Sequence, residues 1–318
     1  MDRFNAALEV VPMIEIPPGV WRTKSGQIPL FDHPTLISNM FHYEGRNTNR
    51  FEDTLRLINI GFIDEGALFL SSLIMHFRCM SERQVRHLAR DRFSKQNEIA
   101  SRLRSLRKIG WFESLVIEDP ETGAKETLWW LGLTAVQYFQ FQGHGADLQD
   151  PWLLINNNKL VIAVCAVNQM RAWFEDRDLI EKASYCPQWP KGEKPRPFAT
   201  FVVRTVHGPL TLYVERLTQA GKPVHYMQTK IAMYEDMIRE SGELIREQGG
   251  SAMVVWSVGS FHAIEEIVGS IDHLPDSLLQ AFVCDESMED FPNAAFFFAQ
   301  KIGRRGEVRL KPLQMDLF

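Results

Sequence analysis

The stretch Phe62–Phe139 opens with FIDEGALFLSSLIMHFRCM, continues through SERQVRHLAR and KQNEIASRLRSLRKIGWF, and ends in two apolar runs around the turn DPETG. The first part is apolar enough to predict a buried helix, and Ser81 stands where the N-cap of a second, shorter helix is expected. The third part is amphipathic, because Ile99, Leu103 and Leu106 fall on one side at about 100° per residue. The apolar runs on either side of the turn predict a β-hairpin.

On the other side of the third predicted helix, Asn97, Ser101, Arg104, Ser105 and Lys108 cluster, and the stretch from Lys95 to Lys108 as a whole has five cations and one acid. Amides and guanidinium groups can reach base edges, while lysine and serine can hold phosphates. Our candidate DNA-binding residues are Lys95, Asn97, Ser101, Arg104, Ser105 and Lys108. Helix, helix, basic helix and hairpin, in this order, predict a winged helix-turn-helix over residues 61–141 that binds duplex DNA. A winged helix that binds protein has the same architecture and remains an alternative.

The totals of the 318-residue chain set limits on its class. The length suffices for two domains with full cores, and the net charge of −5 argues against a general polyanion binder. The four cysteines (79, 165, 186 and 284) form no CxxC pair, which excludes a cysteine-based zinc finger and predicts reduced thiols in a cytosol. A basic-then-apolar leader and a run of about 18 apolar residues are both missing, so we expect a cytoplasmic protein with no membrane partner.

Outside the winged-helix region, the pattern predicts an arm with a buttressing helix at residues 1–60 and a glycine-containing linker at 142–146. Residues 150–300 predict a small mixed-sheet domain, so the expected fold class is α+β or α/β. Its expected elements are a helix at 159–175, strands at 198–206 and 210–216, a helix at 224–248, a strand at 252–258, a helix at 261–270 and a strand at 281–284. The chain contains neither GxGxxG nor GxxxxGK(S/T), so no nucleotide site is predicted.

Several motifs of this second domain follow the pattern of a known family. They are RPFATFVV, LTLYVERL, KIAMYEDM with its spacing of Lys230 and Tyr234, and VVWSVGS. With the order of elements over roughly residues 65–300, they make the chain similar to the replication-relaxation proteins of bacterial plasmids and integrative elements. That resemblance implies a winged helix joined to a domain related to the PD-(D/E)xK nucleases.

The nuclease motif that this resemblance implies is incomplete. The nuclease superfamily uses two acids to hold Mg²⁺ and a lysine to position or activate water. Here the first acid is replaced in Pro197-Phe198, and the second motif reads Glu215-Arg216-Leu217, with leucine in the lysine place. We therefore expect a degenerate site with no cofactor, in which Glu215 is a solvated or hydrogen-bonded strand residue. The alternative is a metal-dependent endonuclease with a migrated site, in which Glu175 or Asp176 supplies a further Mg²⁺ ligand.

Other polar and aromatic residues give weaker signals. His207 lies in a predicted turn, and Lys222, His225 and Tyr226 provide no combination of nucleophile, base and orienting acid. The pair Trp129-Trp130 is expected to pack in the core or wing rather than to stack on bases.

The end of the chain resembles a peptide used in bacterial replication. KIGRRGEVRLKP at residues 301–312 has five cations and one acid, which suggests a flexible basic lead, and LQMDLF follows. Gln-x-x-Leu-Phe resembles the peptide that docks replication proteins on the DNA polymerase sliding clamp. The candidate clamp-binding residues are Gln314, Met315, Leu317 and Phe318. The tail could instead fold back on its own domain, and Gln27–Phe31 matches the same pattern as a weaker candidate.

These observations predict a DNA-binding protein of a mobile genetic element that engages the sliding clamp during replication, maintenance or transfer. The expected division is 1–60, 61–141, 150–300 and a tail at 301–318. A winged-helix transcription regulator, for which the clamp peptide is accidental, is the second alternative. The DNA target and a homo-oligomeric state stay open.

Overall fold

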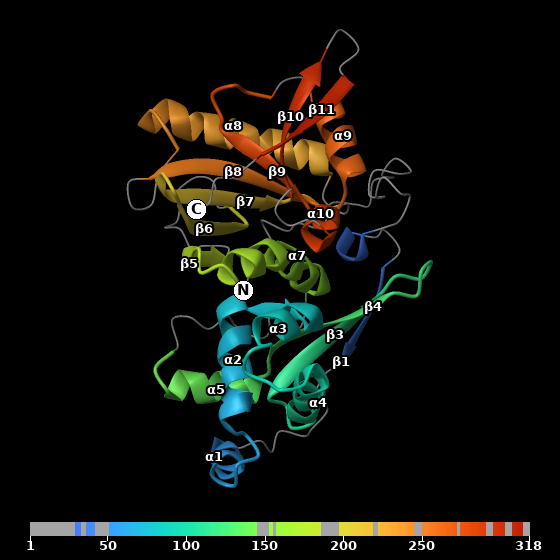
Figure 1. Cartoon of the computed structure of the whole chain (residues 1–318), viewed down its shortest axis with the longest axis vertical. Coiled ribbons are helices and arrows are strands. Elements are labelled where there is room, and N and C mark those ends of the chain that lie inside the picture. The colour runs from blue at the N-terminus through green and yellow to red at the C-terminus, as the bar shows by residue number, and fades with distance from the viewer. Residues whose placement is uncertain are drawn as a thin grey trace. The chain divides into compact units, whose positions relative to one another are not determined.

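The computed structural model describes residues 29–32, 36–41, 51–144, 153–154, 157–185, 197–218, 222–244, 250–271, 274–290, 295–302 and 307–313. Its fold is mixed α+β with two sheets (Figure 1). The chain divides into two compact units. Residues 35–168 form the four-stranded unit, and residues 1–34 together with 169–318 form the seven-stranded unit. The boundary falls inside a helix, whereas the sequence suggested the glycine-containing linker at 142–146.

The four-stranded unit alternates helices with short antiparallel strands. Its elements are β1 (Ile37–Phe41), α1 (Phe51–Asn59), α2 (Glu65–Phe77), β2 (Cys79–Ser81), α3 (Glu82–Leu88), α4 (Gln96–Arg107), β3 (Phe112–Glu118), β4 (Lys125–Leu131) and α5 (Leu133–Phe141). The strand order is β1-β3-β4-β2, and every neighbouring pair is antiparallel. The helix–helix–basic helix–hairpin order therefore agrees with the sequence prediction at the level of secondary structure.

Local side-chain chemistry explains where these elements begin and turn. Asp64 caps α2 by accepting a hydrogen bond from the Ala67 N–H at 2.9 Å. The predicted N-cap at Ser81 is confirmed, and Ser81 forms a reciprocal capping box with Gln84. In the hairpin turn, the Asp119 carboxylate accepts from the Glu121 N–H and the Thr122 hydroxyl. These contacts shape the turn between β3 and β4.

Three elements of this unit escaped the sequence analysis. The first apolar segment is not one long helix, because Arg78 adopts a left-handed backbone (φ 65°) and ends α2, after which β2 pairs with β4. β1 pairs with β3, although its region was expected to be part of an arm or a buttressing helix. After β4 the chain turns at Gly132 into α5, where the sequence analysis placed only the second hairpin strand.

The seven-stranded unit is built on a mixed sheet. Its elements are the second half of α7 (Asn158–Glu175), β5 (Ile180–Tyr185), β6 (Ala199–Thr205), β7 (Gly208–Arg216), α8 (Pro223–Ser241), β8 (Ser251–Val258), α9 (Phe261–Ser270), β9 (Gln280–Cys284), α10 (Asp285–Asp290), β10 (Phe296–Ile302) and β11 (Glu307–Pro312). The strand order is β11-β10-β9-β8-β7-β6-β5; β7, β8 and β9 are parallel, and the other neighbouring pairs are antiparallel.

Both faces of this sheet are covered by helices. Apolar residues of α8 and α9 form one buried cluster with Tyr213, Leu217 and Trp256 from the strands. On the other face, Trp173 and Phe174 near the end of α7 contact Phe296 of β10. Coverage on both faces agrees with strands in which most residues are buried, as in β6–β9.

Two predictions for this unit need correction. The helix expected at 224–248 ends at Ser241, because Gly242 adopts a left-handed backbone (φ 84°) that caps it. The basic lead is not flexible at residues 307–312, where it forms β11, the edge strand of the sheet. Val308 and Leu310 pack against the core, while Arg309 and Lys311 are exposed. This alternation holds the basic residues outward on an ordered strand.

Two further observations concern the cysteines and membrane-spanning helices. Cys79, Cys165 and Cys284 are free and buried, and the Sγ atoms of Cys79 and Cys165 lie 3.7 Å apart. Among the described residues, no helix combines the length and the apolar composition needed to cross a bilayer. Cys186 lies outside the described residues.

Candidate functional site

The six residues predicted to bind DNA lie on α4 and at its two caps. Each of Lys95, Asn97, Ser101, Arg104, Ser105 and Lys108 is exposed. The apolar stripe of the same helix is buried at Ile99, Leu103 and Leu106, as its periodicity predicted. Five of the candidates thus share one accessible side of α4 and its C-cap, with Lys95 exposed at the N-cap, and we call this set of six residues the α4 face.

Cations on α4 fall into two groups that differ in their partners. Arg102 forms ion pairs with Asp64 and Glu98, and Arg107 donates a hydrogen bond to the Ser114 hydroxyl at 3.0 Å. By contrast, Lys95, Arg104 and Lys108 form no ion pair with any described residue. Since an unpaired surface cation is ready to bind an external anion, the α4 face is a candidate phosphate-binding surface.

The pKa of Asp64 reflects its ion pair with Arg102. Partial burial would raise the pKa of Asp64, but hydrogen bonds from Arg102 and from the Ala67 N–H hold this pKa below its usual range. Arg102 thus connects the N-cap of α2 to the middle of α4. Its guanidinium also lies over the Phe93 ring, 5.7 Å from the centroid. We assign Arg102 to the scaffold that supports the α4 face.

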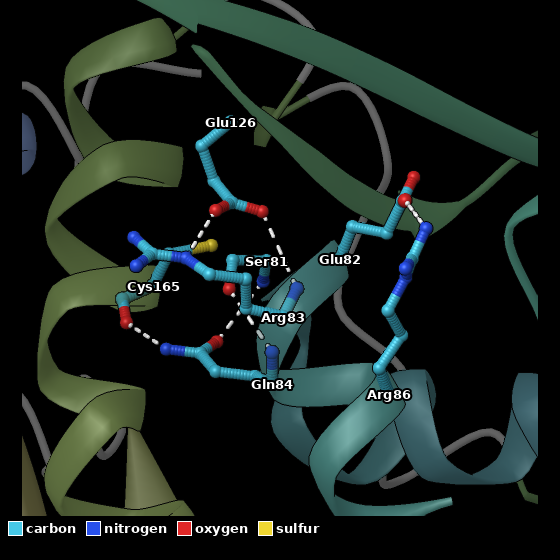
Figure 2. A network of polar contacts seen from close by, with 7 residues as sticks. All are labelled: Ser81, Glu82, Arg83, Gln84, Arg86, Glu126 and Cys165. Atoms are coloured by element: carbon cyan, nitrogen blue, oxygen red, sulfur yellow. Dashed lines mark hydrogen bonds and ion pairs between the residues drawn. The ribbon is translucent and has the colours of Figure 1, made fainter. Parts of the chain in front are cut away.

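A polar network fixes α3, the helix that precedes the α4 face (Figure 2). The Gln84 side chain donates to the Cys165 carbonyl of α7 at 2.7 Å. Arg83 pairs with Glu126 of β4, and burial raises the pKa of this carboxyl although Arg83 opposes the shift. Cys165 and Glu126 belong to the same unit as α3, so these contacts hold α3 from two sides.

The end of the hairpin is acidic rather than basic. Residues 119–124 read DPETGA and contain two acids and no cation. Lys125, the residue that follows this turn in the sequence, is a cation, but it pairs with Glu118 at 2.8 Å. Any phosphate contacts made by this unit are therefore expected from the α4 face and not from the hairpin tip.

The paired tryptophans are core residues. Trp129 and Trp130 of β4 are 1% and 0% exposed. The Arg107 guanidinium lies 5.9 Å from the centroid of the Trp129 ring. Packing in the core is thus the correct interpretation of this pair, and neither ring offers a face to a base.

In the seven-stranded unit, Glu215 lies in a buried polar cluster. Its carboxylate is 0% exposed and accepts hydrogen bonds from the hydroxyls of Tyr226 and Tyr234, both at 2.7 Å. The Lys230 ammonium lies 2.9 Å from the same carboxylate. Burial, followed by the Glu215 charge, raises the pKa of Tyr234 well above its usual value. Tyr226, Tyr234 and Lys230 all come from α8, which packs over the end of β7.

This donor set does not fit Mg²⁺. A magnesium site is built from oxygen ligands and waters, whereas the groups that surround Glu215 are three hydrogen-bond donors, the Tyr226 and Tyr234 hydroxyls and the Lys230 ammonium. Glu175 pairs with Arg171 at 3.0 Å, and Asp176 lies 4.0 Å from Arg177. Within the described residues, no group of three or more His, Cys, Asp or Glu side chains is placed to hold a metal ion.

The remaining sequence candidates separate from one another. His207 lies in an exposed turn where its backbone N–H donates to the Thr205 hydroxyl. Of the trio Lys222, His225 and Tyr226, the last joins the Glu215 cluster, while Lys222 and His225 are exposed. Lys230 is the residue that reasoning about a site missed: its spacing to Tyr234 was noted as a family feature, but its contact with Glu215 was not foreseen.

The two clamp-like peptides lie largely outside the described residues. Gln314, Met315, Leu317 and Phe318 are all outside, but the Leu313 N–H donates to the Phe296 carbonyl at 2.8 Å. Leu313, the last described residue before this peptide, is therefore held at the edge of the sheet. In the internal peptide, Gln27 and Ile28 are outside, whereas Phe31 is buried at 6% exposure.

Comparisons of the chain with protein-family models, with curated proteins and with solved structures gave no match.

Proposed function

We propose that the protein binds duplex DNA through the α4 face. One observation carries this proposal: Arg104 and Lys108 on one side of α4, and Lys95 at its N-cap, are exposed and form no ion pair with any described residue. Asn97, Ser101 and Ser105 lie on the same face and supply amide and hydroxyl groups. Cations that bind phosphate and an amide that pairs with adenine form the chemical combination that DNA recognition needs.

The surrounding topology supports insertion of α4 into a groove. The order α2-β2-α3-α4-β3-β4, with β2 paired to β4, resembles the winged helix. In that architecture the third helix enters the major groove. The chain's net charge of −5 is consistent with a local basic surface and not with binding to any polyanion.

The direct test replaces Arg104 and Lys108 with alanine and measures duplex binding by fluorescence anisotropy at several salt concentrations. Loss of two phosphate contacts should weaken binding and lower the slope of log K against log salt by roughly 1–2. The matched control is Arg204→Ala with Arg239→Ala, which removes two cations from the other unit that are already paired with acids. Unchanged affinity and slope in the Arg104/Lys108 variant would remove DNA from the proposal.

For the whole chain, we propose a cytoplasmic replication, maintenance or transfer protein of a mobile element. Support for a nuclease-like second domain comes from the order α7-β5-β6-β7-α8-β8, with an antiparallel β5–β7 meander and β8 parallel to β7. This order resembles the core of the PD-(D/E)xK family. The engaged carboxylate of Glu215 favours a degenerate site, and an assay for cleavage of plasmid DNA with Mg²⁺ or Mn²⁺ tests the endonuclease alternative.

The terminal peptide is proposed to dock on the sliding clamp. Anchorage of Leu313 on the sheet edge supports this proposal, because the five residues that follow begin at the edge strand β11. The internal peptide is the weaker candidate, since the aromatic ring of Phe31 is buried within its own unit.

Calorimetry with purified clamp and a peptide of residues 311–318 tests this docking. Two buried apolar anchors are worth roughly 1.5–3 kcal/mol each, so Leu317→Ala with Phe318→Ala should abolish measurable binding. Duplex binding by the same full-length variant should not change. A full-length protein that binds the clamp equally well with and without these anchors would contradict the docking proposal. The alternative function, a winged-helix transcription regulator, would then be favoured.

A further inference from the structure

The carboxyl ends of the three parallel strands meet at one buried polar cluster, and we call the space that Asp32 fills beside it the crevice. Arg216 ends β7, Ser257 lies near the end of β8, and Asp285 follows β9. The Arg216 guanidinium donates to the Ser257 hydroxyl at 2.9 Å and to both oxygens of Asp285 at 2.8 and 2.7 Å. Because ligands of open α/β sheets bind outside the carboxyl ends of parallel strands, this crevice is a candidate ligand site.

A carboxylate from a distant part of the chain already occupies it. Asp32 Oδ2 lies 2.9 Å from an Arg216 nitrogen, and the Gly259 N–H hydrogen-bonds to the same side chain. Gly259 directly precedes Ser260, the N-cap of α9. A Cβ atom at position 259 would overlap the Asp32 carboxylate, so glycine is what allows the close approach. The crevice thus combines a guanidinium, a backbone N–H and a helix N-terminus around one carboxylate.

The residues before Asp32 are seated with it. The segment Pro29–Asp32 forms a single 3₁₀ turn, in which the Asp32 N–H donates to the Pro29 carbonyl at 3.1 Å. This turn is the short blue helix beside α10 in Figure 1. Phe31 and Asp32 are 6% and 2% exposed, so an apolar ring and an acid are buried side by side. The turn therefore presents a two-part peptide signal, an aromatic residue followed by an acid.

In the crevice, two carboxylates compete for one guanidinium. Asp32 and Asp285 share the guanidinium of Arg216, and Arg216 Nε has no hydrogen-bond partner among the described residues. Burial first and then the neighbouring Asp285 raise the pKa of Asp32 to about 7, although Arg216 and the Gly259 N–H oppose the shift. An acid that is hard to ionise where it sits is held less strongly than a fully matched ion pair.

We propose that the crevice at the ends of β7, β8 and β9 is a peptide-binding site for an aromatic–acidic segment, and that Pro29–Asp32 is a reversible latch that fills it in cis. The ligand class is an acidic peptide that carries Phe-Asp. Release of the latch opens the crevice to such a peptide in trans and frees residues 29–32. The proposal does not depend on DNA binding.

The experiment offers the latch sequence in trans. The probe is a fluorescent QIPLFD peptide with blocked ends, and binding is followed by anisotropy. The wild type should exclude it, because attachment in cis gives the latch an effective concentration of the order of millimolar. The full-length variant Phe31→Ala with Asp32→Ala should bind it. A peptide with alanine in place of phenylalanine should bind at least about tenfold more weakly, since it loses the buried ring.

The pH dependence has a definite sign. The free peptide carries an ordinary aspartate, whereas the bound one has a raised pKa, so binding takes up a proton. Affinity should therefore fall as pH rises from about 4 to 7 and level off above, with at least about a tenfold loss between pH 5 and 7. The QIPLFN peptide should show no such change, because asparagine does not titrate. The charged groups around the acid are Arg216 and Asp285.

Two results would overturn the proposal. One is a folded Phe31/Asp32 variant that fails to bind the peptide at both pH values; the other is a wild type that binds it equally well. Should the double variant not fold, the full-length Asp32→Asn protein provides an independent measurement. Its unfolding free energy should lose less between pH 5 and 7 than that of the wild type, and equal losses would remove the proton-linked latch.

Discussion

Arginine plays opposite parts in the two units. On α4, Arg104 is exposed and has no ion pair with a described residue, whereas Arg216 of β7 is buried and shared by two carboxylates. The same guanidinium group is thus free to meet an external anion in one place and committed to internal anions in the other. Residue type alone does not separate these roles, but burial and partners do.

The acids show a similar division. Glu215 is enclosed by two tyrosines and a lysine, while Glu121 is exposed at the end of the hairpin. A charge that is buried and fully hydrogen-bonded is expensive to disrupt, whereas a surface charge contributes little to stability. The comparison therefore predicts that changes in the seven-stranded unit affect folding and that changes on the α4 face affect binding.

The largest expected effect comes from Glu215→Ala. It would leave Lys230 and two tyrosine hydroxyls buried without their acceptor, which should lower the free energy of unfolding by roughly 3–5 kcal/mol. Urea denaturation followed by circular dichroism measures the loss. Glu215→Gln keeps the shape and one acceptor oxygen, so it should cost less. Under conditions where either variant is folded, duplex binding should remain at the wild-type level.

A different outcome for Glu215 would break the comparison. Purified protein that cuts DNA with a divalent ion, and loses this activity in the folded Glu215→Gln variant, would place the cluster in a catalytic site. The proposal that the seven-stranded unit contains a degenerate nuclease site would then be wrong.

The next effect concerns selectivity on the α4 face. Asn97→Ala removes an amide that can pair with adenine, and one such pair is worth roughly 1–3 kcal/mol of discrimination between bases. Affinity for a selected site should fall toward the affinity for a scrambled duplex, which should itself change little. Gln137→Ala on α5 removes another exposed amide of the same unit and serves as the control. Equal losses on both duplexes would assign Asn97 to the backbone and not to the bases.

The sequence predicted the parts of the fold that local rules determine. The capping box at Ser81, the amphipathic α4, the hairpin of β3 and β4, and the helix α9 all follow from patterns within about twenty residues. The α4 face could be predicted for the same reason, since helical periodicity alone decides which residues of a helix share a side.

The rest depended on contacts between distant residues. The three residues of β2 have no readable alternation and become a strand by pairing with β4, about fifty residues later. Lys230 reaches Glu215 across a helix–strand packing, and Arg216 meets Asp285 and Asp32 from separate regions. The composition of residues 307–312 predicts a flexible segment because cations dominate it. Val308 and Leu310 alternate with these cations, however, and the segment forms β11.

The smallest expected effect separates two arginines of the same helix, one paired with acids and one not. Arg102 and Arg104 lie two positions apart on α4, yet Arg102 is paired with Asp64 and Glu98 and Arg104 is not paired with a described residue. Arg102→Ala should lower the unfolding free energy by no more than about 1 kcal/mol, because these pairs are partly exposed and screened by water. Arg104→Ala should leave stability within about 0.5 kcal/mol of the wild type.

Duplex affinity should rank the two variants in the opposite order. Arg104→Ala should weaken binding and reduce its salt dependence by about one counterion, whereas Arg102→Ala should leave the salt slope unchanged. Each variant removes one positive charge from the same helix, so a general loss of charge would weaken both equally. If Arg102→Ala lowered the salt slope as much as Arg104→Ala, partners and burial would not be what separates scaffold from contact on this helix. The α4 face would then have to include its ion-paired cations.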